Sequence, residues 1–212
     1  MIKAKDRSKS NQSGFTIIEL VIATLVFSTV LLIATFGVIQ ISRTYIKGFL
    51  ASETENTTRS IIDDVTQAVQ LSGPGGVVIN NSQSGTNWYA FCINGFRYTY
   101  QLNVKVETGI HAFMRDQPSS IGTCPPNTTW SNGTELLSTN ERLVSFSLCN
   151  NSTPSPCNSP TGAADLYQIN LSILYGSDDV TVNNAGKQCL DNSVGGFFCA
   201  LSSTTTTVQE RT

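Results

Sequence analysis

An acidic residue, Glu19, stands at the start of a long apolar run of the sequence. From Leu20 to Ser42 the chain has 23 residues without a charge, rich in Leu, Ile, Val, Ala and Phe. A carboxylate at the centre of a membrane costs about 2.5–3.5 kcal/mol, so an acid in or near hydrocarbon usually has a function and a partner. Glu19 is therefore the first candidate for chemistry, and Gly14 and Phe15 precede it closely.

The uncharged run must be the element that positions Glu19. As a helix it would be about 34 Å long, enough to cross a hydrocarbon layer of about 30 Å. Residues 1–14 carry four bases and one acid, whereas the two bases within residues 43–55 are offset by two acids. The positive-inside tendency therefore predicts a cytoplasmic N-terminus and places the chain after about residue 45 outside.

Three simpler interpretations compete with a functional membrane helix. A secretory signal peptide would have a shorter apolar stretch and a small-residue cleavage site, and neither is present. A buried helix of a soluble protein would show a polar face, which this run lacks. A plain single-pass anchor fits the length but gives no reason for Glu19.

The junction Gly14-Phe15-Thr16-Ile17-Ile18-Glu19-Leu20 follows a short basic leader and opens the apolar helix. In this it resembles the type IV pilin-like family, which includes class III prepilins, minor pilins and type II secretion pseudopilins. The matching motif covers residues 1 to about 45. The remainder of the sequence is consistent with the resemblance but does not establish it.

The resemblance implies that residues 1–14 are a leader. A prepilin peptidase would cut between Gly14 and Phe15 and then N-methylate Phe15, and the missing side chain of Gly14 would let the backbone enter a tight protease cleft. Glu19 would pair with the new amine of a neighbouring subunit, because a charge in low dielectric is much less costly when paired. The implied partners are prepilin peptidase, other pilin subunits and an assembly platform in the membrane.

An amphipathic stretch after the uncharged run predicts that the helix continues beyond the membrane. Its apolar stripe is spaced three to four residues apart: Ile61, Ile62, Val65, Ala68, Val69 and Leu71. Asp63, Asp64, Gln67 and Gln70 lie on the other face, and Ser72-Gly73-Pro74 ends the helix. We expect a membrane part over 15–42 and an exported part over 43–72, with Gly37 and residues 52–58 as places to bend or fray. No heptad is sustained, so the stripe favours packing on a sheet over a coiled coil.

Residues 77–212 read as a β-rich head. Asn94-Gly95 between Trp88–Ile93 and Phe96–Leu102 predicts a two-residue hairpin with a type I′ turn. The other expected strands are Val77–Ile79, Ile110–Met114, Leu143–Leu148, Tyr167–Tyr175, Phe197–Leu201 and Thr204–Val208. Loops rich in Pro, Gly, Ser and Asn are expected at Asp116–Asn132 and Asn150–Ala163. One helix followed by strands predicts an α+β fold, with a long N-terminal membrane-spanning helix packed on an antiparallel sheet.

All six cysteines lie in the part predicted to be outside. An even number in an exported domain favours disulfides, although sequence alone allows fifteen pairings. We expect Cys92–Cys124, Cys149–Cys157 and Cys189–Cys199, since the last two would close short loops. Zinc is a weaker alternative, because no close Cys pair is present and His111 has no Cys nearby.

Evidence for catalysis or for cofactors is weak in this sequence. It has no nucleophile elbow, zinc-protease, phosphate-loop or dinucleotide motif, and His111 reads as a structural or surface histidine. Asp178, Asp179 and Asp191, with Asn183, Asn184 and Asn192, resemble a calcium loop of some pseudopilins but match no EF-hand spacing. We therefore expect no enzyme, no resident metal and no cofactor.

The function favoured by these observations is a structural filament subunit, a minor pilin or pseudopilin. It would wait in the cytoplasmic membrane and then enter a surface or periplasmic filament of a pilus, secretion or competence system. Two alternatives stay open: a pilus-borne binding module for DNA or a surface, and a membrane-anchored envelope enzyme. Charged residues make up only 13% of the chain, and its bases are scattered, so the sequence indicates no nucleic-acid footprint.

Overall fold

A computed structural model describes residues 14–73, 76–80, 87–118, 124–150, 166–178, 181–182, 188–189 and 198–211. Its main helix, α1, runs from Ile17 to Ser72 without interruption. The chain divides into two compact units, Met1–Arg43 and Thr44–Thr212, so α1 contributes to both. Each unit is described separately below.

In the first unit, the side chains of α1 are exposed on all sides. No residue between Ile17 and Ser42 is buried, and a window of this helix has the length and apolar character needed to cross a membrane. Its hydroxyl groups bond back to the carbonyls one turn earlier: Thr24 Oγ1 to Val21 (3.0 Å) and Ser28 Oγ to Thr24 (2.7 Å). These bonds reduce the cost of placing polar side chains in an apolar environment.

In the second unit, α1 buries one face. The buried residues recur every three or four positions: Leu50, Thr54, Thr58, Ile61, Ile62, Val65, Ala68 and Val69. Two expectations are corrected here. Leu71 does not belong to the stripe, because its side chain is 55% exposed. Residues 52–58 do not fray, since they are helical throughout and supply two of the buried positions.

Two threonines of that segment, Thr54 and Thr58, are buried, and the hydroxyl of each has a hydrogen-bond partner. Thr54 Oγ1 donates to the Leu50 carbonyl (2.8 Å), and Thr58 Oγ1 donates to the Thr54 carbonyl (2.8 Å). Because the hydroxyl is satisfied within the helix, the methyl group can face the sheet. A polar stretch of sequence therefore forms part of an apolar interface.

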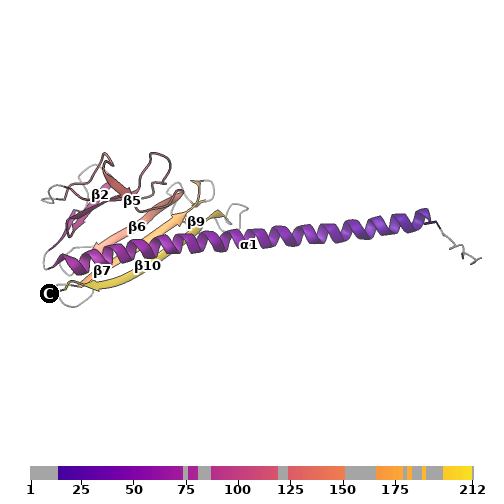
Figure 1. Ribbon diagram of the computed structural model, residues 1–212, viewed down its shortest axis with the longest axis horizontal. Coiled ribbons are helices and arrows are strands. Elements are labelled where there is room, and N and C mark those ends of the chain that lie inside the picture. The colour runs from indigo at the N-terminus through magenta and orange to yellow at the C-terminus, as the bar shows by residue number, and fades with distance from the viewer. Residues whose placement is uncertain are drawn as a thin grey trace, which may run out of the picture. The chain divides into compact units, whose positions relative to one another are not determined.

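Antiparallel strands form the remainder of the second unit (Figure 1). A five-stranded sheet has the order β1-β2-β3-β4-β5: Val77–Asn80, Trp88–Ile93, Phe96–Gln101, Phe113–Asp116 and Gly133–Glu135. A three-stranded sheet has the order β10-β7-β6: Ala200–Gln209, Leu166–Tyr175 and Glu141–Cys149. β8 (Thr181–Val182) pairs with β9 (Gln188–Cys189).

The predicted hairpin joins β2 to β3 in the expected register. Ile93 pairs with Phe96, and Asn94 and Gly95 have φ angles of 49° and 84°. Positive φ at both central residues is the type I′ requirement, which Asn and Gly meet at low cost. The short sequence motif thus determines how the first strand pair forms.

Two strand predictions need correction. The strand expected over Ile110–Met114 begins only at Phe113, because Glu107 and Ile110 close a tight turn around Gly109 (φ 79°). The two C-terminal strands are instead one strand, β10, which pairs with β7 along its whole length. The predicted start of the first of them, Phe197, lies outside the described residues.

The two larger sheets share one hydrophobic core with α1. Asn103 N–H donates to Leu143 (2.8 Å) and Val106 N–H donates to Glu141 (2.9 Å), so residues 103–106 link β3 to β6. Aromatic rings fill the space between the helix and the sheets. The ring of Phe91 stacks on those of Tyr98 and Phe146, with distances between ring centroids of 4.7 Å and 4.9 Å. The predicted α+β class, with a long apolar N-terminal helix on antiparallel sheets, is confirmed.

Disulfides hold two segments of the head. Cys92 is bonded to Cys124 and Cys189 to Cys199, which are two of the three predicted pairs. Cys149 is also disulfide-bonded, and the partner we expect for it, Cys157, lies outside the described residues. Cys92 and Cys124 are buried with Ala90, so this bridge joins β2 to the segment after residue 123.

Candidate processing and assembly site

The first turn of α1 is closed by Thr16 and Glu19. The Glu19 carboxylate accepts hydrogen bonds from the Thr16 N–H (3.3 Å) and the Thr16 hydroxyl (3.1 Å). The Thr16 hydroxyl in turn accepts from the Glu19 N–H (3.3 Å). This reciprocal arrangement is a capping box, which satisfies two N–H groups that a helix terminus otherwise leaves without partners.

The capping box fixes where the helix begins, and therefore leaves Gly14 and Phe15 outside it. Both residues lie before the helix, and the Phe15 side chain is 78% exposed. Apart from its chain neighbours, none of the described residues has an atom within 4 Å of the point where a Cβ on Gly14 would stand. The bond between them is thus accessible and outside the helical hydrogen-bond ladder, as a protease needs.

Glu19 also lies where a negative charge is favourable within its own helix. An acid in the first turn interacts with the positive end of the helix macrodipole, typically by 0.3–1 kcal/mol. Thr16 is its hydrogen-bond partner among the residues that the structure describes, and no basic side chain of this range forms an ion pair with it. The local contacts hold the carboxylate at the helix end without neutralising it.

The other histidine and acid candidates serve the head. His111 Nδ1 lies 3.2 Å from Glu135 Oε2, and the same carboxylate accepts from the Ala112 (3.1 Å), Phe113 (2.9 Å) and Leu137 (3.3 Å) N–H groups. Burial raises the pKa of Glu135, and these backbone donors oppose that shift. This arrangement connects β4 to β5, and both carboxylate oxygens already accept hydrogen bonds from the chain itself.

Of the acidic and amide residues singled out in the C-terminal stretch, the structure describes Asp178. Its carboxylate accepts from Arg142 Nη2 (2.6 Å), and this hydrogen bond lowers the pKa of Asp178. Asp179, Asn183, Asn184, Asp191 and Asn192 lie outside the described residues. Among the residues that are described, no three His, Cys, Asp or Glu side chains gather as a metal site would require.

Two acids with structural roles were missed from the sequence. Asp64, expected on the solvent face of the helix, accepts a hydrogen bond from the Tyr98 hydroxyl (2.9 Å) and pairs with Arg115. Burial, and after it the contact with Asp64, raises the pKa of Tyr98. The spacing of Asp64 beside Val65 could have signalled an edge position, but its partners come from β3 and β4.

The second missed acid, Glu141, is fully buried at the start of β6. Its Oε2 accepts from the Ser138 N–H (2.8 Å), while its Oε1 meets no hydrogen-bond partner within the part of the chain that the structure describes. Burial raises the pKa of Glu141, and the negative charge of Glu53 on α1 adds to the shift. This residue stands against the helix in the part that begins at Thr44.

Comparison with known proteins bears on the N-terminal site. The family model of the prokaryotic N-terminal methylation motif matches residues 9–35, which include Gly14, Phe15 and Glu19. No curated protein and no solved structure matches the chain.

The motif and the apolar helix together support anchoring in a membrane by one helix. The class III signal also implies processing by a prepilin peptidase and assembly with other pilin subunits. The methylation motif, on an apolar helix whose second part is covered by antiparallel sheets, supports a type IV pilin-like protein that a prepilin peptidase processes.

Proposed function

We propose that this chain is a structural subunit, a minor pilin or pseudopilin, of a type IV pilus or a related secretion or competence filament. Its N-terminus would face the cytoplasm and its head the outside of the cytoplasmic membrane. Cleavage between Gly14 and Phe15 would release the subunit from its leader. The filament would then form by packing of the exposed part of α1 against other subunits.

The observation that carries the proposal is the position of Glu19. Its carboxylate is held at the start of an apolar helix by Thr16, and among the described residues no cation neutralises it. Cleavage would create a positive amine at Phe15, next to the capping box. A neighbouring subunit that brings such an amine to Glu19 removes an unpaired charge from low dielectric.

The shape of the head favours a minor over a major subunit. A chain of 198 residues would remain after removal of 14 from 212, which is longer than many major pilins. The head also contains the short strands β4, β5, β8 and β9. Glu19 argues against the family's tip-most initiator, because that subunit typically lacks this acid.

The rival functions have less support. Four bases of the head are used in ion pairs with acids: Arg97–Asp116, Lys105–Glu107, Arg115–Asp64 and Arg142–Asp178. Side chains neutralised in this way offer little to phosphate groups, which disfavours DNA binding. For an enzyme, a cleft with converging reactive groups would be expected, and we propose that the chain has no catalytic role.

A pair of matched substitutions tests the proposal. Glu19→Gln removes the charge in the apolar helix, and Glu55→Gln makes the same change at an exposed helix position in the head. An unpaired charge in the membrane costs about 2.5–3.5 kcal/mol, and 1.4 kcal/mol corresponds to a tenfold change in an equilibrium. Because Glu19→Gln removes the charge that would attract the amine of a neighbouring subunit, we expect it to lower filament incorporation by more than about tenfold.

The measurement is the amount of subunit in sheared filaments, with leader cleavage followed in parallel by the mass of the N-terminal peptide. Glu55→Gln should assemble like the unaltered chain. Normal cleavage and normal incorporation of Glu19→Gln would show that the acid has no role in pairing subunits.

A further inference from the structure

The three-stranded sheet of the head ends in a long strand with an open edge. β10 is the outermost strand in the order β10-β7-β6, and its ten residues, Ala200–Gln209, all pair with β7. Figure 1 shows it beside β7, along the second part of α1. Among the described residues, no strand pairs with the other edge of β10. Such an edge presents a row of unpaired N–H and C=O groups, which is a template for another strand.

The register determines which backbone groups of β10 face that edge. Where the β7–β6 ladder ends, the Gly176 N–H donates to the Asn140 carbonyl (3.1 Å), so Gly176 faces β6. Successive residues of a strand direct their N–H and C=O groups to opposite sides, so the odd-numbered residues of β7 face β10. Their partners in β10 are the even-numbered residues, Ala200, Ser202, Thr204, Thr206 and Val208. The outward groups therefore belong to Leu201, Ser203, Thr205, Thr207 and Gln209.

The five outward residues are accessible. Each of them is exposed, and Leu201 keeps 49% of its surface. Within the part of the chain that the structure describes, no hydrogen bond outside the strand ladders involves their N–H or C=O groups. The Ser203 hydroxyl lies 2.8 Å from that of Ser172 on β7, so it bonds along the face of the sheet and leaves the edge open.

The sequence of β10 contains nothing that would keep another strand away. Proteins usually protect an edge with charged residues, with proline, with a bulge or by keeping the strand short. β10 has ten residues without a charge or a proline, and no bulge interrupts its pairing with β7. A long, uncharged edge of this kind promotes aggregation unless a partner covers it.

The direction of β10 limits which partner can lie there. At one end of the strand Ser72 Oγ donates to Glu210 Oε1 (3.4 Å), and at the other end Leu50 and Phe198 line one surface hollow. β10 therefore runs in the same direction as the part of α1 that belongs to the head. Two copies that pair through this edge about a two-fold axis would point these helix parts in opposite directions, whereas the subunits of a filament share one direction. β1 and β5, at the ends of the other large sheet, have four and three residues, so a second copy would bond only part of β10 through them.

We propose that β10 pairs, in the assembled filament, with an extended strand of a different pilin subunit, so that one sheet continues across two heads. This inference rests on the proposed function, because the partner is met in the filament. Evenly spaced N–H and C=O groups along a strand are matched only by another extended backbone. To bond all five outward residues, the partner strand needs about nine residues. It should carry no charge, since β10 offers none to pair with it.

Hydrogen exchange of the unaltered chain tests the proposal without any substitution. Exchange is measured at single amides in the cleaved subunit, purified from membranes in detergent, and in sheared filaments. In the purified subunit, the outward amides of Ser203, Thr205 and Thr207 should exchange at least about tenfold faster than those of Thr204 and Thr206. In filaments they should slow to the rate of these neighbours. Free exchange of the outward amides in filaments would overturn the proposal and leave the proposed function standing, whereas absence of the chain from filaments would overturn both.

A cross-link identifies what covers the edge. A benzophenone amino acid in place of Thr207 has its side chain on the exposed face of β10, next to the edge. After irradiation of filaments, we expect it to be joined to a different pilin subunit, within a stretch of that subunit that carries no charge. A bond to a second copy of this chain, to another part of the same chain or to no protein would overturn the proposal.

Two substitutions at one position separate the backbone group from the side chain. Thr205→Pro removes an outward N–H that does not bond to β7, and edge strands tolerate proline for this reason. Thr205→Val keeps both the N–H and the branched side chain. We expect Thr205→Pro to lower incorporation into filaments at least about fivefold and Thr205→Val to leave it unchanged. Leader cleavage and urea unfolding of both variants should match those of the unaltered chain, and equal incorporation of the two variants would overturn the proposal.

Discussion

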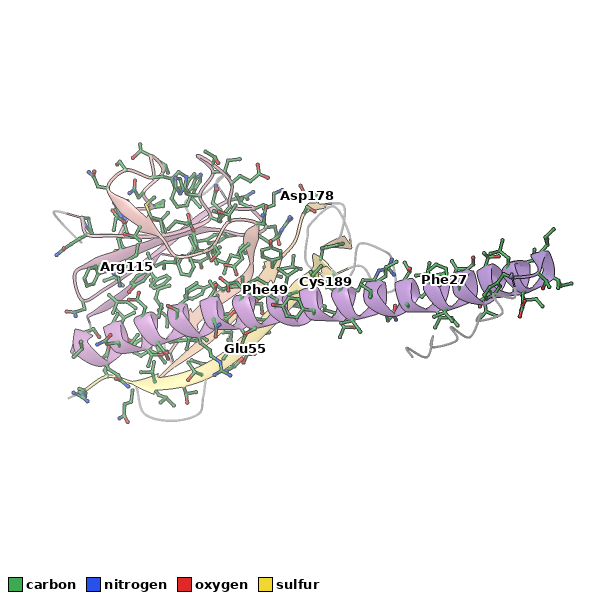
Figure 2. All side chains as sticks on the ribbon, turned by 45° about the vertical axis from the view of Figure 1, so that its right-hand side comes forward. Phe27, Phe49, Glu55, Arg115, Asp178 and Cys189 are labelled. Carbon is green, nitrogen blue, oxygen red and sulfur yellow. A yellow bond between two sulfur atoms is a disulfide. The ribbon has the colours of Figure 1, made fainter. Side chains whose placement is uncertain are left out.

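The two parts of α1 have the same secondary structure but opposite surroundings. Residues 17–42 are apolar and exposed on every side, whereas residues 50–69 bury one stripe against two sheets. Side chains such as Phe27 therefore project outward from the first part, while Phe49 and Glu55 mark the exposed side of the second (Figure 2).

The difference shows which contacts the chain supplies itself. The head satisfies the second part of the helix with its own sheets, so that part can fold within a single chain. The first part has no such cover, and lipid or other helices must surround it, because an apolar surface of this size is unfavourable in water. The same helix is thus a core element in one region and an interaction surface in the other.

The largest expected effect comes from removing buried volume in the second part of α1. Ile61→Ala should lower the free energy of unfolding of the head by about 2–5 kcal/mol, because it leaves a cavity in the core. Ile33→Ala makes the same change in the exposed part and should leave that free energy unchanged.

Urea unfolding in detergent, followed by near-ultraviolet circular dichroism of the head aromatics, measures both values. Equal destabilisation by Ile61→Ala and Ile33→Ala would remove the distinction between the two parts of the helix.

A smaller loss is expected from the disulfides that restrain the sheets. The Cys92–Cys124 bridge closes a separation of 32 residues and the Cys189–Cys199 bridge one of 10. Replacing either pair by serine should cost about 2–4 kcal/mol, and the longer loop about 1 kcal/mol more than the shorter one. The same unfolding measurement gives these values, and a larger loss for the shorter loop would contradict the ranking.

The smallest effect concerns Glu141, which faces Glu53 and Thr57 of α1. Because its pKa is raised in the folded head, its contribution to stability is present at low pH and is lost as pH rises through the folded pKa. Glu141→Gln cannot titrate, so its free energy of unfolding relative to the unaltered chain should increase with pH above the ordinary range of a glutamate.

Unfolding of both chains between pH 4 and pH 8 measures this difference, and Glu55→Gln, at an exposed position that pairs with Arg59, controls for the chemical change itself. A difference that is constant over this range would mean that Glu141 does not titrate as inferred.

Local sequence signals predicted the elements whose formation depends on near neighbours. Asn94-Gly95 specified the hairpin, and the strand expected over Tyr167–Tyr175 forms nearly all of β7. The position of Glu19 was predicted to matter, and the methylation motif includes it. In each case the relevant contacts are made within a few residues or by a regular pattern of hydrophobic side chains.

Features that depend on distant partners could not be predicted in this way. Thr54 and Thr58 look like surface residues, but their hydroxyl groups bond within the helix, so they can pack against the sheet. Asp64 depends on Tyr98 and Arg115, which are 34 and 51 residues away. The capping box of Thr16 and Glu19 is by contrast a local contact, and its Thr-x-x-Glu spacing is the sequence signature that could have predicted it.

The most direct test of the central claim is the N-terminal mass of the protein recovered from cells in which it functions. A filament subunit of this family should begin at Phe15, with one additional methyl group on its amine, both in membranes and in sheared filaments. A functional product that retains Met1, or any residue before Phe15, would contradict the account.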